Sequence, residues 1–232
     1  MAARTPSPPA RKRIRRTPAN AEREILGAAA AFLQANDFRD LTVDGVMAGT
    51  GMVRSAFYNY FADRNALILR LLQDVEAEMM QAISPWVERS SDPVTALRTG
   101  LEQVVEIYAL HGHLLRAIHE ASFHDHEVER AYRQVVDDFI DVVATILRRE
   151  NRSGRTSVPR PREVAHALLT MNTNVLVERL GRAPTDSPRA VAETLQFIWE
   201  RAIYAGAASA DGAGTESAAA LGGRASVTSR AR

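Results

Sequence analysis

Four side chains between residues 53 and 60 have the chemistry of nucleic-acid contacts, and they are Arg54, Ser55, Asn59 and Tyr60. A guanidinium group binds phosphate and also reads guanine edges, and hydroxyl and amide groups bind phosphate oxygens or base edges. In a short helix, Phe57 and Phe61 lie four residues apart on one face and would pack inward. The spacing therefore predicts a helix that presents its polar side chains to double-stranded DNA.

The residues around this segment are typical of a helix-turn-helix. Thr42 can cap a helix over about 42–49, and Gly51 can adopt the positive φ of the turn that follows. Asp63 can cap a third helix. Gly45 inside the first helix is unusual, because it costs roughly 1 kcal/mol relative to Ala. Two short helices joined by a glycine turn place the second helix in the major groove.

The surface expected to face DNA comprises eight residues, which are Thr42, Val53, Arg54, Ser55, Tyr58, Asn59, Tyr60 and Arg64. Tyr58, Tyr60 and Arg64 are suited to phosphate contacts. Arg54 and Ser55 are suited to reading base edges. The alternative is an ordinary three-helix packing motif, which leaves the outward aromatic and arginine side chains unexplained.

This segment resembles the TetR family of bacterial transcriptional regulators. The matching residues are Thr42, Val43, Ala48, Gly51, Phe57, Tyr58, Tyr60, Phe61, Asp63 and Leu67. The departures are Gly45, Met47, Thr50, Arg64 in place of the usual Lys, and Asn65 in place of the usual acid. The resemblance implies a homodimeric repressor that binds a palindromic operator.

Composition and charge agree with a DNA-binding globular protein. The 232 residues are 46% hydrophobic and 25% charged, and the absence of cysteine excludes disulfides and thiolate chemistry. Residues 1–71 hold eleven Arg or Lys against six Asp or Glu, a net charge of +5. Residues 72–205 carry −5 and residues 206–232 carry +1. A basic first third on an acidic body is what a polyanion-binding head requires.

The composition divides the chain into four parts. Residues 1–19 form a basic, Pro-rich tail predicted to be disordered, which either contacts DNA or merely keeps the protein in solution. Residues 20–66 form the DNA-binding domain and residues 67–205 a ligand-binding and dimerisation domain. Residues 206–232, rich in Ala, Gly, Ser and Thr, read as a flexible low-complexity tail.

No apolar run reaches the roughly 18 residues that a membrane span requires. Arg15 and Arg16 ahead of the apolar run 25–33 imitate a twin-arginine secretion signal. Glu22 and Glu24 directly before that run argue against secretion, so we expect a cytoplasmic protein without membrane contact.

The rest of the chain has helical periodicity throughout, which predicts an all-α fold. Helices are expected near 20–36, 42–49, 53–60, 63–88, 92–110, 113–122, 126–150, 160–180 and 187–205. Asp92 and Ser187, each before a proline, are predicted caps. Gly112 and Gly181 are predicted to end helices. Three of the helices belong to the head and six to the body, as the family resemblance implies.

Asn172 is a polar residue within an apolar stripe of helix 160–180. Its amide must be satisfied, since an unpaired buried polar group costs about 1–3 kcal/mol. It bonds either the backbone of a neighbouring helix or a ligand.

The blocks 168–172 and 197–204 are similar to the corresponding helices of the mycobacterial ethionamide-resistance repressors. In that subfamily the residues matching Asn172 and Trp199 line an apolar effector tunnel, whereas the second tunnel Asn falls on Leu169 here. The resemblance implies a hydrophobic small-molecule effector. The candidate ligand-binding residues are Trp86, Tyr108, Phe123, Phe139, Met171, Asn172, Val175 and Trp199.

Five histidines lie between His111 and His126, and imidazole groups bind metals. They suggest an alternative to the DNA-binding regulator, namely a helical metal- or haem-type sensor or enzyme. His119-Glu120 followed by His124 is not the zinc-protease signature, because residues five apart lie about 140° apart around a helix. A non-helical site around His124 and His126 stays open. Because the chain lacks the common nucleophile, phosphate-loop and dinucleotide motifs, we expect no catalysis, cofactor or metal.

Overall fold

The computed structural model describes residues 17–88, 92–182 and 186–205. The predicted contacts of residues 1–16 and the predicted tail 206–232 lie outside the described residues. The elements in chain order are α1 (Pro18–Ala35), η1 (Phe38–Asp40), α2 (Val43–Ala48), η2 (Arg54–Asn59), α3 (Arg64–Val87), α4 (Pro93–Ala121), α5 (His126–Arg152), α6 (Pro161–Leu180) and α7 (Pro188–Tyr204). The η elements are 3₁₀ helices, so the described part of the chain is all-α, which confirms the predicted fold class.

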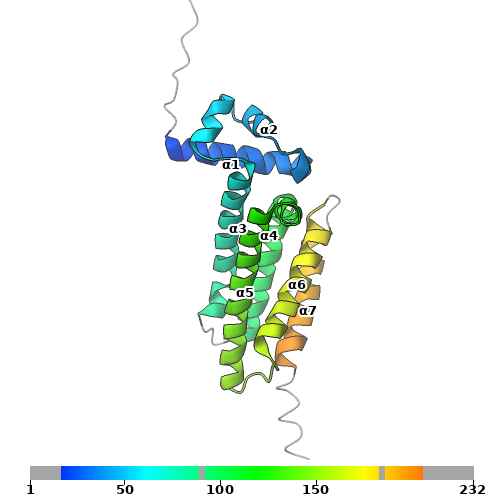
Figure 1. Ribbon diagram of the computed structural model, residues 1–232. Coiled ribbons are helices and arrows are strands. Elements are labelled where there is room, and N and C mark those ends of the chain that lie inside the picture. The colour runs from blue at the N-terminus through cyan, green and yellow to red at the C-terminus, as the bar shows by residue number, and fades with distance from the viewer. Residues whose placement is uncertain (1–16, 89–91, 183–185, 206–232) are drawn as a thin grey trace, which may run out of the picture.

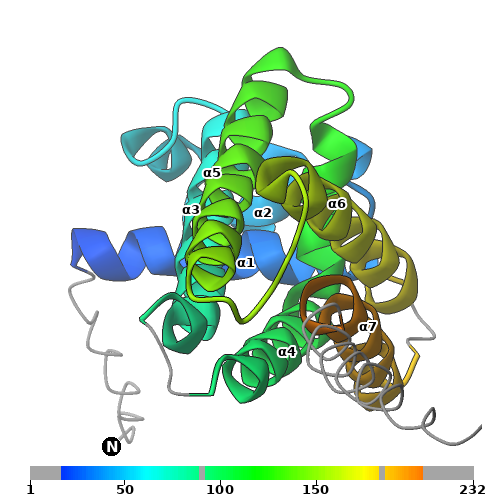
Figure 2. The ribbon, with the colours of Figure 1, turned by 90° about the horizontal axis from the view of Figure 1, so that it is seen from below.

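The head forms at one end of a bundle of long helices (Figure 1). Helix α1 lies across the top of the bundle, and α2 and η2 pack above it, while α3 leaves the head and runs down into the body (Figure 1). Seen from below, α3 to α7 surround a common interior (Figure 2). Helix α4 contacts α3, α6 and α7, which makes it the central helix of the body.

The unusual Gly45 has a packing reason. A Cβ atom at this position would lie 2.8 Å from Cε2 of Phe32 in α1. The cost in helix propensity is therefore accepted because α2 must approach the Phe32 ring closely.

Helix α4 corrects one prediction. We expected two helices, over 92–110 and 113–122, separated at Gly112, but the structure has one continuous helix of 29 residues. Gly112 lies buried inside it, where a Cβ atom would be 2.2 Å from the carbonyl oxygen of Leu180. The glycine thus permits close contact with α6 and does not end the helix. The described body consequently has five helices, not the expected six.

Other predicted boundaries agree with local chemistry. Asp92 accepts hydrogen bonds from the backbone N–H groups of Val94 and Thr95, as expected of a cap. Ser187 precedes α7, but its side chain makes no capping bond, so that detail was wrong. Gly181 directly follows the last residue of α6, as predicted.

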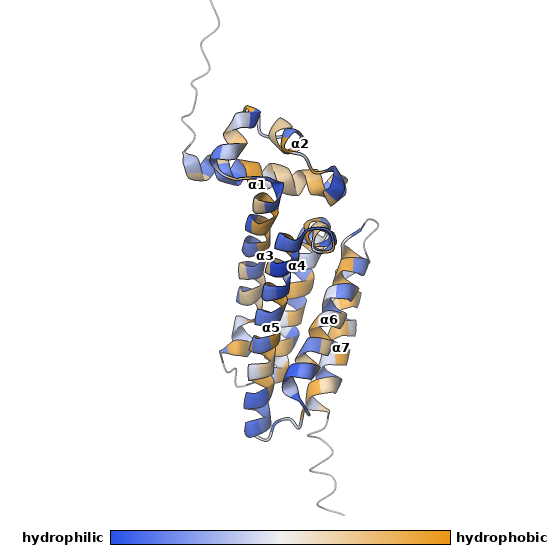
Figure 3. Cartoon of the chain, viewed as in Figure 1, coloured by the Kyte–Doolittle hydropathy of each residue, from blue (hydrophilic) through white to orange (hydrophobic). Residues whose placement is uncertain are grey.

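The head and the upper body share one hydrophobic core. The cluster that contains Phe57 and Leu41 of the head also contains Ile118 of α4 and Leu176 of α6. A second cluster, around Trp86 and Trp199, fills the lower body. Buried apolar residues make up both clusters, whereas the side of α5 that faces the viewer in Figure 3 is mainly hydrophilic.

No helix in the described ranges is both long enough and apolar enough to span a lipid bilayer.

Candidate nucleic-acid interface and internal cavity

The turn between α2 and η2 is built as the sequence predicts. The Thr42 hydroxyl accepts a hydrogen bond from the N–H of Gly45 at 3.0 Å, and Gly51 has a φ of 64°. Phe57 is fully buried and stacks against Phe61 with ring centroids 5.5 Å apart. These contacts and the half-buried Ala56 form the inner face of the head, which leaves the other side chains of η2 exposed.

The outer face of this element carries the side chains suited to DNA contacts. Thr42, Arg54, Ser55, Asn59 and Arg64 are exposed. Val53 is 71% exposed and Tyr58 is 51% exposed, whereas Tyr60 is half-buried against the head core. The segment predicted as an eight-residue helix over 53–60 is a 3₁₀ helix over Arg54–Asn59. The structure thus places seven of the eight predicted residues at the surface of the head and Tyr60 at its edge.

Arg54 and Arg64 are both held by other residues of the head. The Arg54 Nε lies 3.3 Å from Oδ1 of Asp44 in α2, and both side chains are well exposed. Arg64 donates to the carbonyl of Leu41 at 3.3 Å, and its guanidinium lies 5.2 Å from the centre of the Phe38 ring. An exposed ion pair contributes little stability, so Arg54 can exchange its partner for a DNA group at small cost. The Arg64 guanidinium is oriented by its contacts and still exposed.

An apolar cavity of about 90 Å³ lies in the body, lined by side chains of α3 to α7. Five of the eight predicted ligand-binding residues line it, namely Trp86, Tyr108, Phe139, Asn172 and Trp199. Met171 and Val175 are half-buried in the packing of α6 and do not line it. Sequence reasoning missed Gly100 and Thr173, which also line the cavity.

The placement of Phe123 in the cavity wall was wrong. Phe123 is 71% exposed and follows the end of α4, where the chain leaves the bundle. Its ring packs edge-on against His119, with centroids 5.0 Å apart. Helical periodicity cannot position a residue that lies beyond the end of its helix.

The amide oxygen of Asn172 bonds a side chain of α7, a partner that neither predicted alternative named. Asn172 Oδ1 accepts a hydrogen bond from the indole Nε1 of Trp199 at 2.9 Å. Among the described residues its Nδ2 has no hydrogen-bond acceptor. The polar wall of the cavity therefore consists of an amide with one oxygen engaged and two N–H donors unused.

A second polar group reaches the cavity through Tyr108. Burial raises the pKa of the Tyr108 phenol, which is hydrogen-bonded with Thr173. Burial also raises the pKa of Tyr132 to about 12, and Tyr132 lies 3.1 Å from Nδ1 of His119. Burial lowers the pKa of His119. These groups are therefore neutral at pH 7, and the cavity wall carries no charge.

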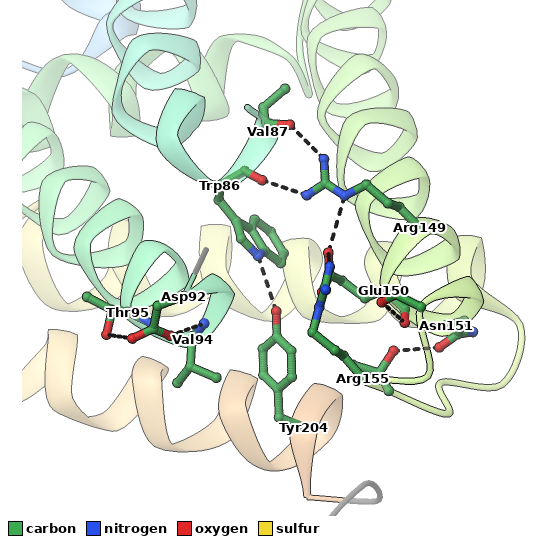
Figure 4. Close-up of polar contacts among 12 residues, drawn as sticks. Trp86, Val87, Asp92, Val94, Thr95, Arg149, Glu150, Asn151, Arg155 and Tyr204 are labelled. Atoms are coloured by element: carbon green, nitrogen blue, oxygen red, sulfur yellow. Dashed lines mark hydrogen bonds and ion pairs between the residues drawn. The ribbon is translucent and has the colours of Figure 1, made fainter. Parts of the chain in front are cut away.

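At the far end of the cavity, Trp86 is fixed by contacts with two other helices, α5 and α7 (Figure 4). Its indole donates to the Tyr204 hydroxyl at 3.3 Å and packs edge-on against Trp199 at 6.1 Å. Arg149 of α5 donates to the carbonyl of Trp86 at 2.9 Å and to that of Val87 at 2.7 Å. Arg149 thus satisfies backbone acceptors at the end of α3.

Arg149 is itself held by Glu150, which is only 1% exposed (Figure 4). Glu150 also binds Arg155 through both carboxylate oxygens, at 2.5 and 3.1 Å. Burial acts to raise the pKa of Glu150, but the hydrogen bonds from Arg155 and Arg149 outweigh it and lower the pKa. Sequence reasoning missed this cluster, although three charged residues in succession at 148–150 were visible.

Several polar contacts join the head to the body, among them the ion pair between Glu22 of α1 and Arg70 of α3 at 3.4 Å. Asn65 at the start of α3 donates to Asp125, the cap of α5, at 2.6 Å. Arg116 of α4 donates to Asp37, between α1 and η1, at 3.1 Å. The Arg116 hydrogen bond is the main cause that lowers the pKa of Asp37.

Three of the histidines have partners of their own in the described structure. His111 pairs with Glu78, His119 with Tyr132, and His126 with Glu129 at the surface. Within the described part of the chain, no group of three or more His, Cys, Asp or Glu side chains is arranged to hold a metal ion. The geometry gives the sensor or enzyme alternative no support.

Two family models match the chain. Residues 25–71 match the model of bacterial regulatory proteins of the tetR family, and residues 97–205 match that of the C-terminal domain of the transcriptional regulator EthR. The first covers the head described above, and the second covers four of the five elements that line the cavity.

Curated relatives share both parts. The chain is 30% identical over 200 residues to the HTH-type transcriptional regulator EthR of Mycobacterium tuberculosis, covering 83% of this chain and 93% of that protein. It is 27% identical over 206 residues to the HTH-type transcriptional regulator EthR of Mycolicibacterium smegmatis, which covers 88% of this chain and 95% of that protein.

Solved structures share the fold. The fatty acid degradation regulator FadR from Bacillus halodurans superimposes with a TM-score of 0.68 at 13% identity, covering 79% of this chain and 95% of that one. SmeT, the repressor of a multidrug efflux pump of Stenotrophomonas maltophilia, superimposes with a TM-score of 0.64 at 20% identity. The match covers 78% of this chain and 89% of that one.

Proposed function

Because the chain belongs to the TetR family of DNA-binding transcriptional regulators, with a C-terminal domain of the EthR type, we propose that it represses a palindromic operator and is released by a hydrophobic small molecule. The protein is a regulator and not an enzyme. One observation carries the proposal: a single chain combines an exposed polar face on the head with an apolar cavity in the body. It would act in the cytoplasm, where operator DNA lies.

On the head, Arg54 and Ser55 would read base edges, since both are exposed at the start of η2. Tyr58, Tyr60 and Arg64 would bind phosphates. Thr42, Val53 and Asn59, which are exposed, would complete the contact surface. The pair between Arg54 and Asp44 would open when DNA replaces the carboxylate.

Two copies of the head are needed because one reads too few base pairs, and the outer faces of α6 and α7 are suited to join them. Phe197 of α7 is 61% exposed and is covered on one side by Arg201. Ala167 and Asn174 of α6 are also exposed. Burial of this face against its copy would form a four-helix homodimer interface.

Two measurements test the dimer and the DNA site. The free protein should sediment at about twice its 25.5 kDa chain mass. In gel-shift titrations, Arg64→Ala should weaken binding to every duplex and reduce the salt slope by about one unit per bound chain, because one phosphate contact is lost. Arg64→Lys keeps the charge and should keep the slope.

Arg148→Ala, near the other end of α5, is the matched control, since it removes an exposed charge 23 residues beyond Asp125, which contacts the head. Thermal melts of each variant separate a lost phosphate contact from a disturbed head, because Arg64 also contacts Leu41 and Phe38. An unchanged salt slope in Arg64→Ala would remove Arg64 from the DNA site, and a monomer at micromolar concentration would refute the dimer.

The cavity supports release by a ligand through its size and its chemistry. At about 90 Å³ it is smaller than the roughly 300–1,000 Å³ of sites for drug-sized molecules. A ligand of that size must move helices apart to bind. If the expanded body separates the two heads so that they no longer match successive major grooves, the ligand lowers DNA affinity according to its preference for the expanded state.

The chemistry of the wall favours an apolar molecule with one hydrogen-bond acceptor facing Asn172 Nδ2. Toluene and benzyl alcohol differ by one hydroxyl and serve as probes, and the two tryptophans in the wall report binding by fluorescence. Asn172→Leu should weaken benzyl alcohol binding several-fold to tenfold, because a neutral hydrogen bond contributes about 0.5–1.5 kcal/mol. Toluene binding should not change.

This substitution also removes the partner of Trp199 Nε1. The double variant Asn172→Leu with Trp199→Phe eliminates that orphaned donor and therefore controls for lost stability. Equal weakening of both probes in Asn172→Leu would show that the amide serves packing alone.

A further inference from the structure

Three groups converge on the guanidinium of Arg116, which is 8% exposed. Its Nε donates to the carbonyl of Gly181 at 3.1 Å. One terminal nitrogen donates to Asp37 at 3.1 Å and to Glu120 at 2.7 Å. One side chain of α4 therefore holds the end of α6 on one side and the head on the other.

The end of α6 cannot slide freely over α4. Gly112 lies so close to the Leu180 carbonyl that a Cβ atom would be 2.2 Å from its oxygen. A Cβ atom at Gly181 would in turn lie 3.2 Å from Cβ of Arg116. Close-packed helices transmit a displacement. A shift of α6 along its axis must therefore move Arg116 as well.

The other part of α6 forms a wall of the cavity. Asn172, Thr173 and Leu176 line it, and Asn172 is bonded to Trp199 of α7. An occupant larger than about 90 Å³ must push against this wall. The same helix therefore contacts the cavity and ends at Arg116.

In the head, Asp37 is connected through its neighbour Phe38 to Arg64, a residue of the surface expected to face DNA. It directly precedes Phe38, which is 6% exposed and whose ring supports the Arg64 guanidinium. A hollow of about 760 Å³ borders Asp37, Arg116 and Glu120, which leaves space for the turn at residues 36–40 to move. The contact between Asn65 and Asp125 holds the head at a second point.

We propose that Arg116 couples the cavity to the DNA-binding head, by linking the Gly181 carbonyl of α6 to the Asp37 carboxylate. Asp37 and Arg116 are positioning residues that contact neither DNA nor effector. The inference rests on the proposed function, because it assumes that the head binds DNA and that the cavity wall responds. Coupling is reciprocal, so DNA bound to the head must alter the cavity wall.

This reciprocity permits a test with DNA alone. The chain has two tryptophans, Trp86 and Trp199, and both line the cavity. Protein labelled with 5-fluorotryptophan should give two ¹⁹F resonances, assigned with Trp86→Phe. The probe is a duplex selected from a random-sequence library with the unmodified protein. Saturating DNA should shift the Trp199 resonance, while fluorescence anisotropy of labelled DNA reports binding independently.

Asp37→Asn should abolish this shift while the protein still binds DNA. The variant should fold, because Arg116 keeps Glu120 and the Gly181 carbonyl as partners and Asn65 keeps Asp125. Asp40→Asn is the matched control, since Asp40 ends the short helix η1 that Asp37 precedes and borders the same hollow without an ion pair to Arg116. Asp37→Glu, which keeps the carboxylate, should restore the shift.

A full DNA-induced shift in Asp37→Asn would overturn the coupling role of Arg116. So would an unmodified protein that binds DNA, by anisotropy, without moving either resonance. In both cases DNA binding stands. A protein that binds no duplex would instead refute the proposed function, and the inference with it.

Discussion

Gly112→Ala should lower the melting temperature by roughly 5–10 °C, although alanine is normally the better helix former. The added Cβ would lie 2.2 Å from the Leu180 carbonyl oxygen and 3.2 Å from Cα of Gly181. Neither is the end of a flexible side chain, so α4 and α6 must move apart. Overpacking of this kind costs about 1–3 kcal/mol, and each kcal/mol shifts the melting temperature of a protein this size by about 2–4 °C.

Gly100→Ala is the matched control within the same helix. Gly100 is also buried in α4, but its nearest heavy atoms would lie 3.6 to 3.7 Å from a new Cβ, an ordinary contact distance. Its melting temperature should stay constant or rise, since Ala replaces Gly in a helix interior. Equal melting temperatures for the two variants in differential scanning calorimetry would contradict the close approach of α4 and α6.

Glu150→Gln should reduce the free energy of unfolding by about 3 kcal/mol at pH 7, the lower end of the range for a broken buried ion pair. The lower end applies because Arg155, with 49% of its side chain exposed, keeps part of its hydration. The substitution leaves Arg149 and Arg155 without their carboxylate and loosens the end of α3, whose carbonyls Arg149 binds. Urea unfolding at constant pH measures the loss.

The pH dependence of this difference has a definite sign. The pKa of Glu150 is lower in the folded protein than its ordinary value of 4.5. The ionised Glu150 carboxylate thus makes its full contribution to stability above about pH 4.5. This contribution disappears as the pH falls through the pKa that Glu150 has in the folded protein. The difference in the free energy of unfolding between the native protein and Glu150→Gln should therefore disappear at acidic pH.

Glu193→Gln in α7 provides the comparison, because Glu193 forms an exposed pair with Arg189 four residues away. Such pairs contribute about 0.3–0.5 kcal/mol, so this variant should unfold almost like the native protein. A loss in Glu150→Gln no greater than in Glu193→Gln would mean that the buried cluster adds no stability.

Local chemistry was sufficient to predict the head. The Thr42 cap, the Gly51 turn and the buried Phe57 each follow from residues within a few positions along the chain. The outward side chains could be identified by elimination once the inward face was assigned. Their contacts with DNA stay predictions.

The body could be predicted only in part, because its important contacts join residues far apart in sequence. From the sequence alone Gly112 is interpreted as a helix end, because its close contact with α6 is visible only in the folded structure. The Arg116–Glu120 pair is visible as a four-residue spacing, but the bond to Asp37 spans 79 residues. Periodicity likewise placed Asn172 and Trp199 inside the bundle without showing that they bond each other.

The shared core of the head and upper body limits how modular this regulator can be. Leu67 and Ile68, just past the boundary expected at residue 66, are fully buried in the same cluster as Phe57 and Ile118. The head therefore cannot be exchanged as an independent folding unit. A chimera that exchanges DNA-reading heads at that boundary would join two halves of different cores. A functional graft must carry the first turns of α3 together with the matching ends of α4 and α6.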